Sequence, residues 1–344
     1  MITFGINGFG RIGRTSFRVW WHHHRDRIGL KAINTSGSME LEDWAHLLRH
    51  DTNYGLFDAQ ITVERQQSRH DVSDDNPVLG TLQVGERRVL VTAQRQPAKI
   101  PWSEYGVQTV IESTGVFTTL DKAGQHLAGG AQRVVISAPA KGDGIQTGVI
   151  GVNDLKDGQV QSNASCTTNC VAPVTRVMVE TFGVEKAVMT TIHAYTDDQN
   201  TQDNSHHKDL RRARAAAENI IPTTTGAAKA TTKIIPELTD KFDGMAVRVP
   251  VPVGSLSDMV FVTSRPTSVD EVNQVFRQAA DQDRWRGILA VTDQPLVSSD
   301  IVGRSESSIV DLELTKVIGG NLVKVVSWYD NEWGYCHRLV EQVQ

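Results

Sequence analysis

Residues 1–14 read MITFGINGFGRIGR, and this stretch decides the fold of the first half of the chain. An apolar run, Ile2–Ile6, is followed at once by the pattern G-x-G-x-x-G at Gly8, Gly10 and Gly13. In a strand–loop–helix unit, the first glycine permits a tight turn and the second lets the backbone approach a pyrophosphate. The third lets the helix pack closely on the strand. The stretch therefore predicts a dinucleotide-binding loop.

Beyond this loop, the first half alternates short apolar runs with helical patterns, which predicts a parallel sheet with helices on its faces. The expected strands are Ile2–Ile6, Leu30–Ile33, Val107–Ser113 and Arg133–Ser137, and the expected helices are Arg11–His24, Leu41–Arg49 and Leu120–Leu127. Between them, the short alternating runs of Phe57–Gln96 predict an antiparallel excursion with a mobile loop at Ser68–Pro77.

The second half begins with a long helical pattern, Thr168–Phe182. Long strands in series follow it and predict a largely antiparallel sheet. These strands are Val184–His193, Met245–Val253, Ser257–Ser264, Ser308–Val317 and Leu322–Trp328. A last helix is expected at Trp333–Gln344, after a turn at Tyr329–Glu332.

Composition limits the class of protein. A length of 344 residues is typical of two domains. The formal net charge of -5 argues against nucleic acid or an anionic membrane as the main partner. No window approaches ~18 uninterrupted apolar residues, and the N-terminal stretch resembles neither a signal nor a transit peptide. Three cysteines cannot form a disulfide framework in a chain this long, so we expect a reducing compartment, the cytoplasm.

The cofactor fingerprint departs from its usual form after the second strand. A carboxylate for the adenosine ribose is expected about 20 residues after the glycines. The chain instead reads Ala32-Ile33-Asn34-Thr35-Ser36-Gly37. Because a carboxylate would repel a 2′-phosphate, its absence permits NADP and removes one hydrogen-bonding partner of NAD. The alternative is that Asn34 and Thr35 only form a turn.

Cys166 is the candidate nucleophile. It lies in Ser165–Cys170, at the start of a helical pattern, where unpaired amides and the helix dipole lower a thiol pKa. His193, at the end of an expected strand, is a candidate base. The alternative is that Cys166 is a small buried hydrophobe. Cys170 and Cys336 are expected to serve packing.

Two further features suggest anion sites. The hydroxyl-rich turn Thr223–Gly226 precedes a helix, and Arg248 lies mid-strand among apolar residues, where a charge is usually paired or bound to an anion. The basic run from His206 to Arg214 is more simply explained as a solvated loop. The run His22–His24 is expected to be a solvated helix end, with adventitious metal binding as the alternative, and we expect no resident metal.

Several of these segments closely resemble the phosphorylating glyceraldehyde-3-phosphate dehydrogenase family, in order along essentially the whole chain. They are Asn7–Arg14, Ser165–Cys170, His193–Thr196, Thr225–Lys229 and Asp330–Tyr335. The resemblance implies an α/β protein with a Rossmann-type dinucleotide-binding domain, residues 1–164 and 329–344. A second α+β catalytic domain, residues 165–328, would be built on a largely antiparallel sheet. It also implies a homotetramer.

The resemblance implies roles for individual residues. Cys166 would attack the aldehyde of glyceraldehyde 3-phosphate, and His193 would act as base before inorganic phosphate cleaves the thioester to give 1,3-bisphosphoglycerate. The residues implied for the substrate phosphate are Thr196 and Arg248, and those for the attacking phosphate are Ser165, Thr167, Thr225 and Gly226, with Arg212. The cofactor residues implied besides the glycines are Arg11, Ile12, Thr35, Arg95, Ser137, Asn331 and Tyr335.

The chain departs from NAD-specific members of the family at two places. Thr35 stands where they have an aspartate, and the loop 201–208 lacks their leucine-proline pair and has one extra residue. Both changes remove obstacles to a 2′-phosphate, which His206, His207 or Lys208 of a neighbouring subunit could approach. We therefore expect dual use, with NADP at least as good as NAD.

Two other functions compete with this interpretation. Erythrose-4-phosphate dehydrogenase is a close relative whose product is a free acid, and the intact Ser165, Thr167 and Thr225 favour the phosphate-using enzyme over it. An RNA-binding or scaffolding role through the dinucleotide site is the alternative of a different class. The net charge and the lack of a basic-aromatic surface make that role secondary.

Overall fold

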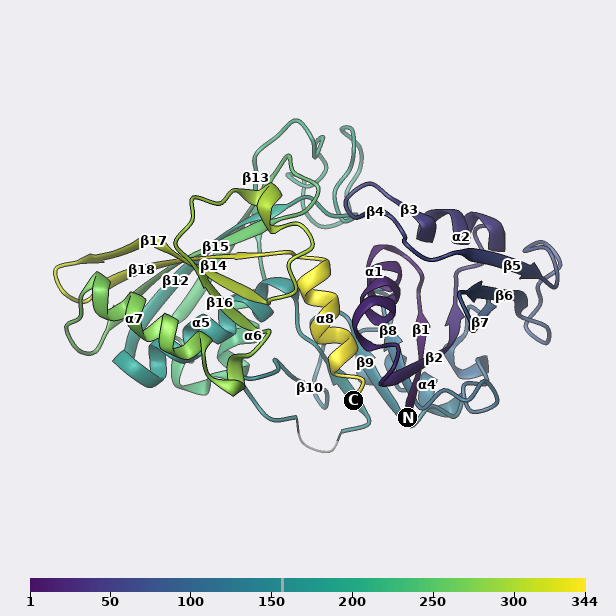
Figure 1. Ribbon diagram of the computed structural model, residues 1–344. Coiled ribbons are helices and arrows are strands. Elements are labelled where there is room, and N and C mark those ends of the chain that lie inside the picture. The colour runs from purple at the N-terminus through teal and green to yellow at the C-terminus, as the bar shows by residue number, and fades with distance from the viewer. Residues whose placement is uncertain (156–157) are drawn as a thin grey trace. The chain divides into compact units, whose positions relative to one another are not determined.

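A computed structural model describes residues 1–155 and 158–344. The chain forms two compact units, whose helices and strands are labelled in Figure 1. Unit 1 comprises Met1–Gly148, Leu155–Ala164 and Cys336–Gln344, and unit 2 comprises Val149–Asp154 and Ser165–Tyr335. The domain bounds expected from the sequence, with the return at residue 329, stay a prediction.

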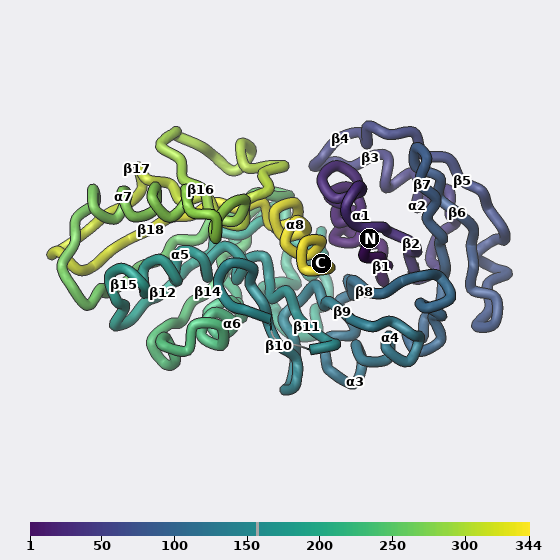
Figure 2. Tube along the Cα trace, turned by 60° about the horizontal axis from the view of Figure 1, so that its bottom comes forward, coloured from purple at the N-terminus to yellow at the C-terminus, as the bar shows by residue number. Residues whose placement is uncertain are grey.

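Unit 1 contains a nine-stranded sheet in the order β10-β11-β9-β8-β1-β2-β7-β6-β5. Its strands are β1 Ile2–Asn7, β2 Ile28–Asn34, β5 Ile61–Arg65, β6 Val78–Val84, β7 Arg87–Thr92, β8 Thr109–Glu112, β9 Arg133–Ile136, β10 Gln146–Thr147 and β11 Val160–Ser162. A separate hairpin pairs β3 His50–Asp51 with β4 Gly55–Leu56. Seven neighbouring strands of this sheet run parallel, which confirms the predicted α/β class: β7, β2, β1, β8, β9, β11 and β10. Figure 2 shows β8, β9 and β11 side by side.

The predicted antiparallel excursion is confirmed, since β5, β6 and β7 pair antiparallel at one edge of this sheet. Residues 68–77 between β5 and β6 form neither helix nor strand. Hydrogen bonds tie this loop to its surroundings: the Ser68 hydroxyl donates to Glu40, and Lys99 donates to Asp74. The mobility expected of this loop stays a prediction.

The helices of unit 1 are α1 Arg11–Val19, the π-helix η1 Trp20–His24, α2 Leu41–Arg49, the 3₁₀-helix η2 Pro97–Lys99, α3 Leu120–Ala123 and α4 Gln125–Ala128. The predicted helix Arg11–His24 is therefore regular only to Val19, and the predicted Leu120–Leu127 breaks at Gly124. The expectation of a solvated histidine run is wrong for His24, which is 3% exposed. The wide π-turn draws this residue inward together with Trp20 and Trp21.

Unit 2 contains a seven-stranded sheet in the order β13-β14-β12-β15-β18-β17-β16. Its strands are β12 Val184–Ala194, β13 Ile221–Thr224, β14 Phe242–Val249, β15 Ser255–Thr263, β16 Leu289–Thr292, β17 Ser308–Ile318 and β18 Leu322–Tyr329. The pairs β12–β14 and β16–β17 are parallel and the other described neighbours antiparallel, which confirms a largely antiparallel sheet. The expected strand Met245–Val253 ends at Val249, because Pro250 and Pro252 lack the amide that a ladder needs.

Three helices pack on this sheet: α5 Cys166–Phe182, α6 Ala227–Ile234 and α7 Val269–Ala280 (Figure 1). Short 3₁₀-helices are η3 Pro236–Leu238, η4 Asp283–Trp285 and η5 Ser298–Ile301. The last helix, α8 Trp333–Glu341, begins in unit 2 and ends in unit 1. Among the described residues, no helix is long and apolar enough to cross a membrane.

Candidate active site

Cys166 is the first residue of α5, two residues earlier than the predicted start of this helix. Ser165 caps the helix, because its hydroxyl oxygen accepts from the Thr168 amide at 3.1 Å. Ala164 precedes the cap with a φ of 54°, a left-handed conformation that costs a non-glycine residue about 1–3 kcal/mol. This turn and cap place the half-buried thiol at the positive end of the helix dipole.

His193, near the end of β12, lies against this thiol, with 3.4 Å between Cys166 Sγ and His193 Nε2. The other ring nitrogen, Nδ1, lies 2.7 Å from the carbonyl oxygen of Ala194. A carbonyl only accepts, and this contact is shorter than the 3.2 Å between Nδ1 and Arg248 Nη1, so we assign the ring proton to Nδ1 and treat the guanidinium as a neighbouring charge. The lone pair of Nε2 then faces the thiol, which is the arrangement of a base beside a nucleophile.

Burial opposes charge on both members of the pair. It lowers the pKa of His193 to about 3, and the charge of Arg248 adds to this effect. Burial also raises the pKa of the Cys166 thiol, although Arg248 and hydrogen bonds from Thr167 work in the opposite direction. The expectation of a lowered thiol pKa is therefore wrong for this state, because it considered the helix amides and not desolvation. The resting pair is a neutral thiol beside a neutral imidazole.

Sequence reasoning missed a chain of hydroxyls behind the thiol. Thr191 Oγ1 donates to the Leu256 carbonyl at 3.1 Å, so it accepts from the Tyr329 hydroxyl at 2.8 Å. The Tyr329 oxygen in turn accepts from Thr167 Oγ1 at 3.0 Å. Burial raises the pKa of Tyr329, which keeps the phenol protonated. Alternation along β12 puts Thr191 and His193 on one face, a signal that was available in the sequence.

Arg248 on β14 stands directly opposite His193, because β12 and β14 pair in parallel register there. Its Nη1 donates to Thr196 Oγ1 and to the Ala194 carbonyl, both at 3.1 Å. Its Nε is buried without a hydrogen-bond partner in residues 1–155 and 158–344. A largely buried cation that touches a threonine hydroxyl beside the thiol is suited to bind an anionic group of a substrate.

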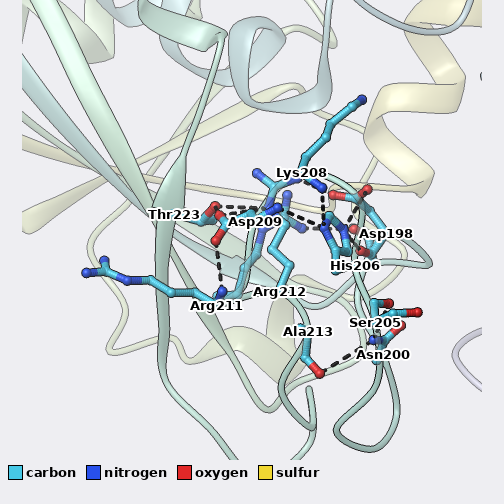
Figure 3. A network of polar contacts seen from close by, with 12 residues as sticks. Asp198, Asn200, Ser205, His206, Lys208, Asp209, Arg211, Arg212, Ala213 and Thr223 are labelled. Carbon is cyan, nitrogen blue, oxygen red and sulfur yellow. Dashed lines mark hydrogen bonds and ion pairs between the residues drawn. The ribbon is translucent and has the colours of Figure 1, made fainter.

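Arg212 belongs to the loop between β12 and β13, and Figure 3 shows it between Thr223 and Asp198. Its guanidinium donates to Thr223 Oγ1 at 2.9 Å and to the Thr224 carbonyl at 3.0 Å, and it pairs with Asp198. Its charge lowers the pKa of both His193 and Arg248, although other causes are larger. Arg212 therefore acts on His193 and Arg248 through its charge. Sequence reasoning did not single out Asp198.

A hollow of about 520 Å³ lies beside this loop, and its lining includes Lys208, Arg211, Arg212, Thr223 and Met245. It has a basic rim because Lys208 has no ion-pair partner within the described part of the chain, and Arg211 has none there either. Thr225 and Gly226 follow at the start of α6, where the Thr225 hydroxyl accepts from the Ala227 amide at 3.2 Å.

The structure thus links Cys166, His193, Arg248 and Thr196 in a chain of side-chain contacts, in which each residue touches the next. Ser165 serves as the helix cap. In the described residues, no hydrogen bond joins the turn 225–226 to this group. The roles that the resemblance implies for these residues remain predictions.

Asn331 is fixed by its side-chain oxygen, which accepts from the Gly254 amide at 3.1 Å and from Ser255 Oγ at 2.9 Å. Ser255 Oγ also accepts from the Ala194 amide, which connects Asn331 to the end of the histidine strand. This orientation leaves the amide NH₂ of Asn331 as its donor end. Tyr335, four residues later and within α8, is buried.

The glycine loop of unit 1 has the form that the dinucleotide interpretation requires. A Cβ at Gly13 would lie 2.1 Å from the Gly8 carbonyl, and Gly8 itself has a φ of +95° and packs against Thr114. A Cβ at Gly10 would meet nothing within 4 Å. The first and third glycines are therefore required by packing, whereas the second leaves open space at the N-terminus of α1, where the helix amides favour an anion.

The other predicted cofactor residues of unit 1 lie near the carboxyl ends of its strands. The guanidinium of Arg11 is paired with Asp51 at 2.7 Å, so a contribution of Arg11 to a pyrophosphate would come from its backbone. Ile12 is the next residue of α1, and Ser137 follows β9 with its amide bonded to the Glu112 carbonyl.

Thr35 directly follows β2 and is buried. Its hydroxyl donates to the Thr92 carbonyl at 3.0 Å and accepts from the Gly37 amide at 3.3 Å. Arg95 lies three residues after Thr92, beyond the end of β7, and its side chain is exposed. This corner of unit 1 therefore holds an exposed cation and a neutral residue at position 35.

His206 serves the structure of its own loop (Figure 3). Its Nδ1 accepts from the amides of Lys208 and Asp209 at 3.2 and 3.0 Å, and its Nε2 donates to the Asp198 carbonyl at 3.0 Å. Both nitrogens are committed to these bonds. Of the three residues expected to approach a 2′-phosphate, His207 and Lys208 are exposed, whereas His206 is bonded within its own loop, and the approach itself stays a prediction.

Comparisons with known proteins agree over nearly the whole chain. A family model described as "Glyceraldehyde 3-phosphate dehydrogenase, NAD binding domain" matches residues 2–120, and one described as "Glyceraldehyde 3-phosphate dehydrogenase, C-terminal domain" matches residues 165–331. A protein of Streptomyces coelicolor named glyceraldehyde-3-phosphate dehydrogenase is 50% identical over an alignment of 344 positions, which covers 99% of this chain and 97% of that protein. Proteins of the same name from Mycobacterium avium and Mycobacterium bovis are 48% and 49% identical over 98% of this chain and 96% of each relative.

Proposed function

The chain belongs to the glyceraldehyde-3-phosphate dehydrogenase family, and on that premise we propose that it oxidises D-glyceraldehyde 3-phosphate to 1,3-bisphosphoglycerate with NAD or NADP. The observation that carries the proposal is the 3.4 Å contact between the Cys166 thiol and the unprotonated nitrogen of His193. A dehydrogenase that uses a covalent thiol intermediate needs a nucleophile and a base within this distance.

In the first step, the Cys166 sulfur attacks the aldehyde carbon while His193 Nε2 takes the thiol proton. The imidazolium then returns the proton to the developing alkoxide, which gives a thiohemiacetal. Burial disfavours charge on both partners, so the ion pair exists only briefly and the guanidinium of Arg248 supports its thiolate. Arg248 and Thr196 share a hydrogen bond beside the thiol, and together they bind the phosphate of the substrate.

In the second step, His193 Nε2 takes the proton of the thiohemiacetal hydroxyl, and the carbon becomes a thioester carbonyl. When bound, the nicotinamide cofactor supplies the acceptor for the hydride that leaves this carbon. Asn331, whose side-chain oxygen is held by Gly254 and Ser255, offers its NH₂ group to orient the carboxamide of the ring.

In the third step, inorganic phosphate attacks the thioester carbonyl, the carbon–sulfur bond breaks, and Cys166 leaves as a thiolate that His193 reprotonates. Arg212 supports the phosphate anion by its charge, with the hydroxyls of Ser165, Thr167 and Thr225 and the backbone of Gly226 around it. The pairing of Arg212 with Asp198 orients its guanidinium and leaves the local charge close to neutral until the anion arrives.

The dinucleotide fits the glycine loop, because the space beyond Gly10 is open where a pyrophosphate would lie. We propose that NADP is used at least as well as NAD. Thr35 carries no charge and its hydroxyl is committed to the backbone, so nothing at this position repels a 2′-phosphate. The exposed Arg95 supplies a cation at the same corner, and charged hydrogen bonds are worth about 1.5–3 kcal/mol each.

We further propose a cytoplasmic homotetramer, in which His207 or Lys208 of a neighbouring subunit completes the cofactor pocket. The three cysteines, Cys166, Cys170 and Cys336, form no disulfide bond in the part of the chain that the structure describes, which supports a reducing compartment, and the latter two are fully buried as packing residues are. Burial also raises the pKa of the Cys170 thiol to about 12, which makes it unreactive.

Steady-state kinetics with two aldehydes test the proposal. Glyceraldehyde 3-phosphate and erythrose 4-phosphate are each offered with NAD and with NADP, with and without inorganic phosphate. We expect the higher kcat/KM for glyceraldehyde 3-phosphate and a strict requirement for phosphate. Phosphate-independent turnover with a preference for erythrose 4-phosphate would assign the alternative activity, and a kcat/KM for NAD far above that for NADP would refute dual use.

The Cys166→Ala variant is the matched control. It is expected to lose oxidation and to bind the cofactor as the wild type does, since the glycine loop lies in unit 1. Retained turnover in this variant would refute the mechanism.

A further inference from the structure

The histidine run after α1 meets the last helix of the chain inside unit 1. His24 ends the π-helix η1, and His337 and Glu341 lie one turn apart on α8. The ring centroids of His24 and His337 are 5.8 Å apart, and His23 lies still nearer to His337, at 4.6 Å. π-Helices are rare and frequently mark functional positions.

Three of these side chains converge on one point. One ligand atom from each of His24, His337 and Glu341 can be chosen so that all lie within 4.8 Å of one another. Ligands of a tetrahedral dication, at about 2.0–2.2 Å from the metal, would need only small rotations from this arrangement. Both imidazoles are almost fully buried, at 3% and 5% exposure, whereas Glu341 reaches solvent and leaves a path for an ion.

The buried imidazoles are neutral near pH 7 and can offer lone pairs. Burial lowers the pKa of His24 to about 4, and burial likewise lowers the pKa of His337. The Nε2 atom of His24 is buried with no hydrogen-bond partner in the described part of the chain. Neither the dehydrogenase mechanism nor the core packing explains this orphaned nitrogen, which is unusual for a buried polar atom.

We propose that His24, His337 and Glu341 bind a transition-metal dication of the Zn²⁺ type. Two imidazoles and one carboxylate are a donor set that such ions prefer, with a fourth position left for water. This site lies wholly within unit 1 and does not rest on the proposed function. It departs from the sequence-based expectation that the chain holds no metal.

The charges around the three ligands favour metal ions that bind nitrogen over hard cations. Arg27 donates to His24 Nδ1 at 2.8 Å, and Arg338 donates to Glu341 at 2.6 Å. Two nearby guanidiniums oppose a cation, so affinity must come from coordination by nitrogen and not from charge. The hard ions Mg²⁺ and Ca²⁺, which require several oxygen ligands, are therefore excluded.

Arg27 also sets the tautomer of His24. While it donates to Nδ1, the ring proton resides on Nε2, the atom that would bind the metal. Metal binding requires that the proton move to Nδ1 and that Arg27, which is exposed, turn away into solvent. Arg338 can retain one oxygen of Glu341 while the other binds the ion. Removal of the Arg27 side chain should therefore tighten binding.

Titration with Co²⁺, followed by its visible absorption and by calorimetry, tests the proposal in the full-length protein. The Cys166→Ala background removes the reactive thiol, which would itself bind soft metals. We expect one Co²⁺ per chain with the absorption of a tetrahedral N/O site, displaced by Zn²⁺ and unaffected by Mg²⁺. His337→Gln and Glu341→Gln should each weaken binding at least tenfold, and Arg27→Gln should strengthen it.

His22→Gln is the matched control, because His22 belongs to the same run but contacts Asp58 and the ring of Phe57. Its affinity for Co²⁺ should equal that of the parent. Glu341→Gln keeps the shape of a half-exposed side chain, so circular dichroism should confirm an unchanged fold. Binding that survives both His337→Gln and Glu341→Gln, or that falls equally in His22→Gln, would overturn the proposal as adventitious binding by surface histidines.

Discussion

Replacing Arg248 with methionine is expected to move the reaction of Cys166 with an alkylating agent to higher pH. The guanidinium lies 3.2 Å from His193 Nδ1, and the opposite side of that ring touches Cys166 Sγ at 3.4 Å. Its charge stabilises the thiolate and so lowers the thiol pKa, against the larger effect of burial. Without it, the thiol pKa rises, and less thiolate is present at any given pH.

The size of the effect follows from this geometry. The imidazole ring separates the two groups, so the guanidinium lies roughly 8 Å from the sulfur, where two unit charges interact by about 2 kcal/mol at an effective dielectric constant of about 20. At about 1.4 kcal/mol for each unit, the midpoint of the alkylation profile of Arg248→Met should therefore rise by about 1–2 pH units. Arg248→Lys keeps the charge, so its midpoint should stay close to that of the wild type.

The lysine variant separates charge from geometry. One ammonium cannot reproduce the planar fork that donates to Thr196 and Ala194 and still reaches a substrate phosphate. Loss of one charged hydrogen bond, worth about 1.5–3 kcal/mol, should raise the KM for the aldehyde roughly 10- to 150-fold.

The assay is the iodoacetamide rate from pH 7 to 11, with Cys166→Ala as the background. Cys170, whose pKa burial raises to about 12, should contribute nothing to it. Where a midpoint lies above this range, the rate at a fixed pH on the rising limb gives the shift, since the rate falls about tenfold for each unit by which the thiol pKa rises. Equal midpoints for the methionine variant and the wild type would refute the electrostatic role of Arg248. Equal shifts in the methionine and lysine variants would show that packing, and not charge, sets the thiol pKa.

Three further changes test other parts of the structure. Gly13→Ala should lower stability by about 1–3 kcal/mol in thermal unfolding, because its Cβ would meet the Gly8 carbonyl at 2.1 Å. Gly10→Ala should keep the Tm of the wild type and weaken cofactor binding. A lower Tm in Gly10→Ala than in Gly13→Ala would contradict the assigned roles. Tyr329→Phe should cost about 1–3 kcal/mol in urea unfolding, since two buried threonine hydroxyls lose their partner, and an unchanged midpoint would exclude the hydroxyl chain. Thr35→Asp should reduce kcat/KM for NADP at least tenfold relative to NAD, and an unchanged ratio would place the selectivity elsewhere.

Local patterns were sufficient for much of the fold. The turn after β1 could be predicted because its glycines are dictated by contacts within a few residues, as the 2.1 Å approach between positions 8 and 13 illustrates. The helix Leu41–Arg49 was predicted to the residue, since its apolar face and its acidic first turn are both local features. The π-turn at His24 was missed, because its extra residue per turn depends on packing and has no periodic signature.

The candidate site, like the fold, could be predicted from the sequence only in part. Cys166, His193 and Arg248 could be named from residue type and family resemblance, but their protonation could not. The pKa of His193 depends on burial and on the neighbouring strand, neither of which a sequence window contains. The sequence predicts a turn that begins at Tyr329, whereas this residue ends β18 with its hydroxyl between Thr167 and Thr191.

The sequence by itself determined the dinucleotide loop and the class of each sheet, because short-range sterics and periodicity act within a few positions. It predicts the nucleophile from residue type together with the family resemblance. The tertiary structure alone decided which groups meet. The parallel register of β12 and β14 sets Arg248 beside His193 across 55 residues of chain. Likewise, the fold of unit 1 brings His24 to a helix at the far end of the sequence. Such encounters depend on strand pairing and burial over the whole domain, and those are properties of the folded chain.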